Sequence, residues 1–254
     1  MLELRRVKKV YSGIPAVNDV SFVVPAGEVT GYLGPNGSGK SSTLKMIVGL
    51  IEPSDGEILF NDEPISRNRI EYRQRFGYVP EEPQLYPNLT GAEYLQMVGQ
   101  LRGLPEHKLA EKIDGFLDLL SLHGDRNVAI SSYSKGMRQK VLLAGALLHN
   151  PDLIILDEPF SGLDLNTGLV LRDLVQGLAA RGKAVLLSAH ELDTIERVCS
   201  KVVILSKGRI AAHDSIERLR SLMSLPTLER IFSQLAIEQD TESISRQIVQ
   251  LVES

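Results

Sequence analysis

The sequence predicts an α/β fold with a mostly parallel sheet, and two observations carry the prediction. Short apolar segments typical of strands recur along the chain, and helical segments separate several of them. A glycine-rich run has the order glycine, any four residues, glycine, lysine, serine. This pattern is typical of a phosphate-binding loop that connects a strand to the helix after it. The expected strands are 1–10, 19–24, 29–33, 57–60, 76–79, 153–156, 184–188 and 201–206. The run consists of Gly34, Pro35, Asn36, Gly37, Ser38, Gly39, Lys40, Ser41 and Ser42.

The flanks of this run favour a phosphate-binding loop (P-loop) over a glycine-rich turn with a solvated lysine. A short strand, 29–33, precedes it and a helix is expected over 41–50. Glycine permits the φ angles that turn successive N–H groups into one concavity at a helix N-terminus, where a polyphosphate binds. We expect the Lys40 ammonium to reach the β- and γ-phosphates and the Ser41 hydroxyl to ligate Mg²⁺. The sequence therefore predicts a P-loop NTPase core.

Composition narrows the functional classes. A chain of 254 residues suits one large domain, or one domain with an inserted subdomain. A net charge of −4 disfavours a broad nucleic-acid surface, and the single Cys199 cannot form an intramolecular disulfide. The charged N-terminus argues against a signal peptide, and no apolar run approaches the length of a membrane span. We expect a cytoplasmic setting, no nucleic-acid partner, and membrane contact only through a partner.

Four basic residues near the N-terminus allow two interpretations. Arg5, Arg6, Lys8 and Lys9 could face anionic lipid. Leu2, Leu4 and Val10 alternate with the charges, which instead favours a charged edge strand.

Helical patterns dominate between residues 83 and 149. A capping box runs from Thr90 to Glu93, and 109–122 is amphipathic. Helical spacing returns after the breaker Pro226. We therefore expect 1–82 and 150–225 to form the core, 83–149 an inserted helical subdomain, and 226–254 a helical tail that packs.

A second group of polar residues follows an apolar segment. The strand 153–156 is followed by Asp157 and Glu158, so two carboxylates lie where a buried parallel strand would present them to a ligand. Asp157 suits Mg²⁺, directly or through water, and Glu158 suits proton acceptance from a water aligned on the γ-phosphate. A capped turn before Pro159 is the structural alternative, which the P-loop in the same chain disfavours.

With these motifs and those that follow them in order, the chain resembles the ATPase subunit of ATP-binding cassette (ABC) transporters over nearly its whole length. The resemblance implies that Tyr11 stacks on adenine, although a lone tyrosine on a strand could be surface packing. Ser134, Lys135, Gly136 and Met137, after Tyr133, occupy the place of the family's LSGGQ signature, with three departures from it. In the family this segment closes over the γ-phosphate bound by the partner subunit.

Further family positions follow. Ser161, Gly162, Leu163 and Asp164 match the D-loop of the family's dimer interface, and His190 matches the switch histidine near the γ-phosphate. Glu81 stands where the family usually has glutamine. Either side chain offers Mg²⁺ an oxygen, but the carboxylate adds charge, so we expect an altered Mg²⁺ or pH profile.

The resemblance implies an ATPase with an antiparallel N-terminal β subdomain that uses ATP and Mg²⁺, with Glu158, His190 and Lys40 as catalytic residues. It implies a homodimer or heterodimer of ATPase subunits, peripheral on the cytoplasmic membrane face, bound to an integral membrane permease. Glu81, the signature segment, 101–103 and 228–232 resemble the ABC-2-type exporter branch. A soluble assembly ATPase, such as the iron-sulfur scaffold ATPase, and a non-hydrolysing nucleotide sensor are the alternatives. The substrate remains open.

Overall fold

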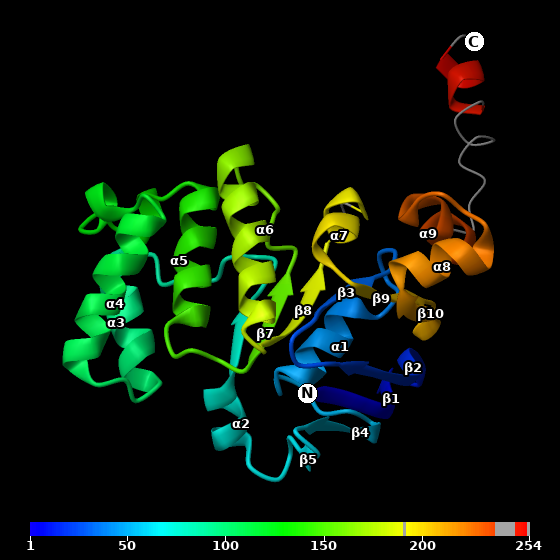
Figure 1. The fold of residues 1–254 in the computed structure, drawn as a ribbon, viewed down its shortest axis with the longest axis horizontal. Helices are drawn as coiled ribbons and strands as arrows, with labels where there is room; N and C mark the ends of the chain where they lie inside the picture. The colour runs from blue at the N-terminus through cyan, green and yellow to red at the C-terminus, as the bar shows by residue number, and fades with distance from the viewer. Residues whose placement is uncertain (190–191, 237–246, 253–254) are drawn as a thin grey trace.

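The computed structural model describes residues 1–189, 192–236 and 247–252, which form two sheets and the helices around them (Figure 1). The strands are β1 (Leu2–Tyr11), β2 (Ile14–Val24), β3 (Val29–Leu33), β4 (Asp55–Phe60), β5 (Glu63–Pro64), β6 (Phe76–Val79), β7 (Leu153–Asp157), β8 (Ala184–Ser188), β9 (Lys201–Ser206) and β10 (Arg209–Ser215). The helices are α1 (Lys40–Ile47), α2 (Arg69–Arg75), α3 (Gly91–Leu101), α4 (Glu106–Leu119), α5 (Lys135–Leu147), α6 (Leu165–Ala180), α7 (Leu192–Val198), α8 (Ile216–Met223) and α9 (Leu228–Ala236).

The larger sheet has the strand order β10-β9-β3-β8-β7-β6, and only β10 pairs antiparallel with its neighbour. The predicted mostly parallel sheet is thereby confirmed. Strands β7 and β8 are buried on both faces, because alternate residues point into two different cores. Ile154 and Leu156 enter one core and Leu153 and Ile155 the other. Because both faces of these strands are buried, polar side chains that bind a ligand are expected at the carboxyl ends of the strands.

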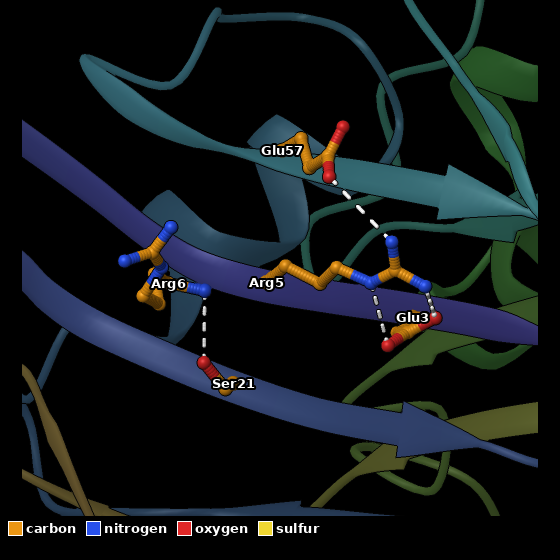
Figure 2. A network of polar contacts seen from close by, with 5 residues as sticks. All are labelled: Glu3, Arg5, Arg6, Ser21 and Glu57. Carbon is orange, nitrogen blue, oxygen red and sulfur yellow. Dashed lines mark hydrogen bonds and ion pairs between the residues drawn. The ribbon is translucent and has the colours of Figure 1, made fainter.

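The smaller sheet is antiparallel, with the order β2-β1-β4-β5, so the prediction that the N-terminal segment is an edge strand is wrong. Strand β1 lies between β2 and β4, and two of its basic side chains form ion pairs with carboxylates on β1 itself and on β4. Arg5 contacts the carboxylates of Glu3, at 2.8 Å, and Glu57, at 3.7 Å (Figure 2). Lys8 pairs with Asp55 at 3.2 Å.

Strand β2 begins at Ile14, five residues before the predicted start at 19, because a tight hairpin turn connects it to β1. Ser12 and Gly13 both have positive φ, at 48° and 83°, which is the conformation of a two-residue turn matched to the strand twist. Pro15 is tolerated in β2 because this strand lies at the edge of its sheet. The hairpin brings the start of β2 beside the P-loop, where the backbone of Ala16 lies close to Gly39.

Helix α1 joins the two sheets. Its buried Leu44, Met46 and Ile47 belong to one apolar cluster that also contains residues of the small sheet, such as Leu4, and of the large sheet, such as Ile155. The far face of the large sheet is covered by α5, α6, α7, α8 and α9, whose apolar residues form a second cluster. The P-loop therefore sits on a helix that is held from both sides.

Between residues 83 and 149 the described structure is helical, and α3, α4 and α5 gather at one side of the molecule around their own apolar cluster (Figure 1). The predicted capping box is confirmed: Thr90 Oγ1 accepts from Glu93 N, and Glu93 Oε2 accepts from Thr90 N. Helix α4 covers 106–119 rather than 109–122, because Pro105 at its N-cap and the acidic Glu106 favour an earlier start.

At the C-terminal side, helix α9 packs through Leu228 and Ile231 into the cluster that covers the large sheet. Helices α8 and α9 lie on the side of the molecule opposite α3 and α4 (Figure 1). Within the described ranges, no helix is long and apolar enough to span a bilayer.

Candidate nucleotide-binding site

The loop between β3 and α1 has a backbone that only glycine permits at two positions. A Cβ at Gly34 would stand 2.5 Å from both the Leu205 carbonyl oxygen and Ser38 Oγ. Gly39 is the N-cap of α1 with φ 103°, and a Cβ there would overlap the Ala16 carbonyl oxygen. The loop is anchored by Gly208 N, which donates to Ser38 O at 3.0 Å. The structure thus places the glycine-rich run as a rigid loop at a helix N-terminus, as phosphate binding requires.

Lys40 begins α1, and its side chain folds back over the loop. Its Nζ donates to the carbonyl oxygens of Gly34 and, at 3.3 Å, of Pro35. Burial lowers the pKa of the Lys40 ammonium, while the carboxylates of Glu158, Asp157 and Glu81 raise it. Glu81 and the adjacent pair Asp157 and Glu158 come from two distant parts of the chain.

Asp157 and Glu158 end β7 as predicted, and both are almost completely buried. The register pairs Asp157 with Ser188 at the end of the parallel strand β8. Ser188 Oγ donates to Asp157 Oδ1 at 2.6 Å and accepts from Glu158 N at 3.1 Å. Ser188 therefore orients the Asp157 carboxylate and holds the backbone of Glu158. Sequence reasoning missed this role, although a serine ending an apolar strand next to β7 is the same signal that identified the two acids.

Glu158 has a left-handed backbone, with φ 50°, which is uncommon for a residue other than glycine. Its N–H also donates to Ser188 O at 3.2 Å, and its carbonyl oxygen accepts from Ser161 N at 3.1 Å. The surrounding structure thus holds the residue in a strained turn at the end of the strand. Such conformations persist where neighbouring contacts determine the backbone, and they cluster at functional sites.

Glu81 follows β6, the strand beside β7, at the same edge of the sheet, and its side chain is exposed. Burial, together with the carboxylates of Asp157 and Glu81, raises the pKa of Tyr78 to about 12. Ser41, on the first turn of α1, is also exposed. Among the described residues, no group of three His, Cys, Asp or Glu side chains is preassembled as a metal site.

The structure places all but one of the remaining predicted nucleotide-binding and catalytic residues. Tyr11 ends β1 with 45% of its surface exposed, and Lys9 Nζ lies 5.3 Å from its ring centroid. The ring therefore offers one open face at the turn of the β1–β2 hairpin. Asn36, Gly37 and Ser42 lie in the loop and the first turn of α1. The predicted switch histidine, His190, lies outside the residues that the structure describes.

The predicted signature and D-loop segments lie against each other. Ser134 is the N-cap of α5, and its hydroxyl accepts from Met137 N at 3.2 Å. Lys135 Nζ donates to Ser161 Oγ at 3.0 Å, and a Cβ at Gly136 would stand 3.4 Å from Gly162 O. Asp164, which ends the D-loop segment, caps α6 by accepting from Thr167 N.

The comparisons with known proteins agree with this geometry. The family model described as ABC transporter matches residues 17–161. The ABC transporter ATP-binding protein NatA of Bacillus subtilis is 35% identical, over 90% of this chain and 93% of NatA. The Nod factor export ATP-binding protein I of Cupriavidus pinatubonensis is 35% identical, over 85% of this chain and 68% of its own.

Two solved structures extend the agreement to the whole fold. The ATP-binding subunit of an ABC transporter superimposes with a TM-score of 0.88 at 36% identity, over 92% of this chain and 99% of its own. A dimeric ATP-binding cassette in a post-hydrolysis state, bound to ADP and Pi, superimposes with a TM-score of 0.78 at 26% identity, over 85% of this chain and 99% of its own. This chain belongs to the ABC transporter family, as a subunit that binds and hydrolyses ATP.

Proposed function

We propose that this subunit uses ATP with Mg²⁺ as one member of a head-to-tail pair and thereby drives export through a separate membrane permease. The observation that carries the proposal is the placement of two features at one edge of the parallel sheet: the glycine-rich loop after β3, with Lys40 folded over it, and the buried Asp157 and Glu158 at the end of β7. One cation at the phosphate loop and several acids at the ends of adjacent strands are the parts that phosphoryl transfer to water needs.

Each residue near the phosphates has a distinct task in this proposal. The backbone N–H groups from Gly37 to Lys40 bind the phosphate oxygens, and the Lys40 ammonium neutralises the β- and γ-phosphates. Pro35, Asn36 and Ser42 complete the loop. Tyr11 stacks on the adenine.

The chemical step is the attack of a water on the γ-phosphorus. The water proton passes to the Glu158 carboxylate. The bond between the γ-phosphorus and the bridging oxygen breaks, and ADP leaves with its electron pair. Ser188 supports this step through its hydrogen bond with Glu158 N, since a base displaced by about 1 Å loses much of its effect. His190 is proposed, from its motif alone, to donate a hydrogen bond to the γ-phosphate or to the water.

The oxygen donors fit Mg²⁺. Ser41, Asp157 and Glu81 supply a hydroxyl and two carboxylates, and Mg²⁺ is usually held by one or two carboxylates together with substrate phosphates rather than by an all-protein cage. When bound, the ion neutralises charge that develops on the phosphates.

Glu81→Gln is expected to raise the free Mg²⁺ concentration for half-maximal ATPase activity, because it removes one of the two carboxylates. An effect of roughly tenfold is expected, the size typical for a partner that tunes a metal site. The measurement is ATP hydrolysis at saturating ATP over a series of free Mg²⁺ concentrations. Glu82→Gln is the matched control, since Glu82 is the next residue and is also exposed. Identical Mg²⁺ curves for both variants would remove Glu81 from the site.

The pair is proposed because the signature segment and the P-loop act on opposite sides of one ATP. Ser134, the Gly136 N–H and the N-terminal end of α5 suit the γ-phosphate of ATP bound by the partner. In a two-fold pair of such subunits, each would then contribute the same surface, and two sites would form. The dimeric cassette with bound ADP and Pi supports this arrangement.

A groove between α2 and α3 supports the proposed permease contact. Its volume is about 670 Å³, and it is lined by apolar side chains from α2, α3, α5, β6 and the segment just after α1. Leu50, Ile70 and Leu101 are 64%, 75% and 80% exposed. Large apolar side chains grouped on a surface in this way are typical of sites where another molecule binds. Arg73 and Arg102 are the charged residues of its lining. The groove therefore suits an amphipathic helix of the permease that carries apolar and acidic side chains.

The test is purification of the full chain from its native cells in mild detergent, followed by identification of stoichiometric partners by mass spectrometry. A multi-spanning membrane protein is expected. Leu101→Glu should reduce its recovery at least about tenfold, because the carboxylate removes an apolar contact, repels the acidic side chains expected on the permease helix and competes with them for Arg73 and Arg102. Leu119→Glu, on α4 at 83% exposure and outside the groove, should recover it normally. Recovery of soluble partners alone would instead favour an assembly ATPase.

A further inference from the structure

The second residue of the signature segment reaches the D-loop of its own chain. Lys135 Nζ donates to Ser161 Oγ at 3.0 Å. The stem of the lysine lies on Gly162, since a Cβ at that glycine would stand 3.0 Å from Lys135 Cδ and 3.3 Å from Cε. Gly162 has φ 76°, so its backbone conformation and the space above it both favour glycine. A glycine at 135, as in the LSGGQ pattern, would have no side chain to make these contacts.

Ser161 in turn is tied to the proposed general base. Its N–H donates to Glu158 O at 3.1 Å, and two residues further on Leu163 N donates to Phe160 O at 3.2 Å. Glu158 N is held on its other side by Ser188. The peptide groups flanking Glu158 are therefore held by Ser188 and by Ser161, which links the position of Ser161 to the turn that carries Glu158.

We propose that Lys135 is a positioning residue that couples the two ATP sites of the pair through Ser161 and Glu158. The inference rests on the proposed head-to-tail arrangement. There, Lys135 faces the ATP of the partner, whereas Glu158 acts on the ATP of its own chain. A phosphate oxygen forms a stronger, charge-assisted hydrogen bond with the ammonium than a serine hydroxyl does. ATP in one site thus draws Lys135 from Ser161 and changes the turn that holds Glu158 in the other site.

The consequence is cooperative hydrolysis. With two interacting sites the Hill coefficient for ATP can approach about 2, and without coupling it is about 1. Lys135→Met retains the length of the side chain but removes the donor, and Ser161→Ala removes the acceptor. Both variants are expected to bring the Hill coefficient to about 1, because neither can pass the state of one site to the other. The double variant should match Lys135→Met, because Ser161 then has no ammonium to accept from.

The experiment measures ATP hydrolysis against ATP concentration for the full chain and these variants, with thermal unfolding as a check on folding. Lys135→Arg keeps a donor that reaches Ser161 and should restore a Hill coefficient above 1. Lys108→Met is the matched control, since Lys108 lies exposed on α4, away from both segments. A wild-type Hill coefficient of 1, or an unchanged coefficient in a folded Ser161→Ala variant, overturns the inference. Absence of any hydrolysis by the wild type would instead contradict the proposed catalytic site itself.

Discussion

Glu158→Gln is expected to trap an ATP-bound dimer of this subunit. Glutamine has nearly the shape of glutamate, but its amide cannot accept the proton of the attacking water. Loss of a general base slows hydrolysis by roughly 100- to 10,000-fold. Removal of a carboxylate close to Lys40 and the γ-phosphate also lessens repulsion of the bound triphosphate. ATP therefore remains between the subunits, and the contacts of its γ-phosphate keep the pair closed.

The measurement is the mass of the variant by size exclusion with light scattering, with and without saturating MgATP. A shift from monomer to dimer is expected with MgATP alone. Glu106→Gln, at the exposed start of α4, is the matched control and should dimerise no more than the wild type. Adding Lys40→Ala to Glu158→Gln should abolish the dimer, since nucleotide then binds weakly. A Glu158→Gln protein that stays monomeric with MgATP bound would contradict the head-to-tail geometry.

Much of this site is predictable from the sequence because its parts are local. The P-loop depends on glycines at fixed spacing, and the structure places Gly34 and Gly39 where any Cβ would collide. Asp157 and Glu158 follow a strand whose apolar character is complete, so their location at the sheet edge follows from the strand alone. The capping box at Thr90 is likewise a pattern within four residues. Local rules were sufficient in each of these cases.

The errors arose where pairing between distant segments decides the outcome. The N-terminal strand carries basic residues, which suggests an exposed edge, yet it pairs with β2 on one side and with β4 on the other, where Glu57 and Asp55 lie opposite two of the basic residues. The sequence pattern of the strand does not indicate which acidic residues of another strand will lie opposite its basic residues. The Ser12-Gly13 turn was a recognisable hairpin signal, and neglecting it moved the predicted start of β2 by five residues.

A search for sequence motifs also could not predict the contacts that support the site. Ser188 meets Asp157 only because β7 and β8 pair in one register. The contact of Lys135 with Ser161 joins segments 26 residues apart through side chains that no spacing rule connects. The groove beside α3 likewise combines residues from four elements and from the segment that follows α1. Sequence therefore identified the residues proposed to touch ATP, and the structure was needed for those that position them.

Lys40→Ala is expected to weaken ATP binding by roughly 10- to 100-fold, the loss that corresponds to about 1.5–3 kcal/mol for hydrogen bonds with a charged group. The ammonium is held over the loop by the carbonyl oxygens of Gly34 and Pro35, so it lies ready at the phosphate site. The acids Glu158 and Asp157 would then face the triphosphate without a compensating cation from the loop, and their repulsion adds to the loss.

Titration calorimetry with MgATP measures this affinity directly, without dependence on turnover. Lys45→Ala is the matched control, because Lys45 is an exposed lysine in the last turn of the same helix and should leave the affinity unchanged. Lys40→Ala removes the whole side chain and also leaves two carbonyl oxygens of the loop without their donor. A second variant, Lys40→Met, therefore keeps the aliphatic part of the side chain and removes only the ammonium. Equal weakening in both variants assigns the effect to the ammonium. Wild-type affinity in both would mean that the glycine-rich loop holds the phosphates without its lysine, through the N–H groups and the helix terminus alone.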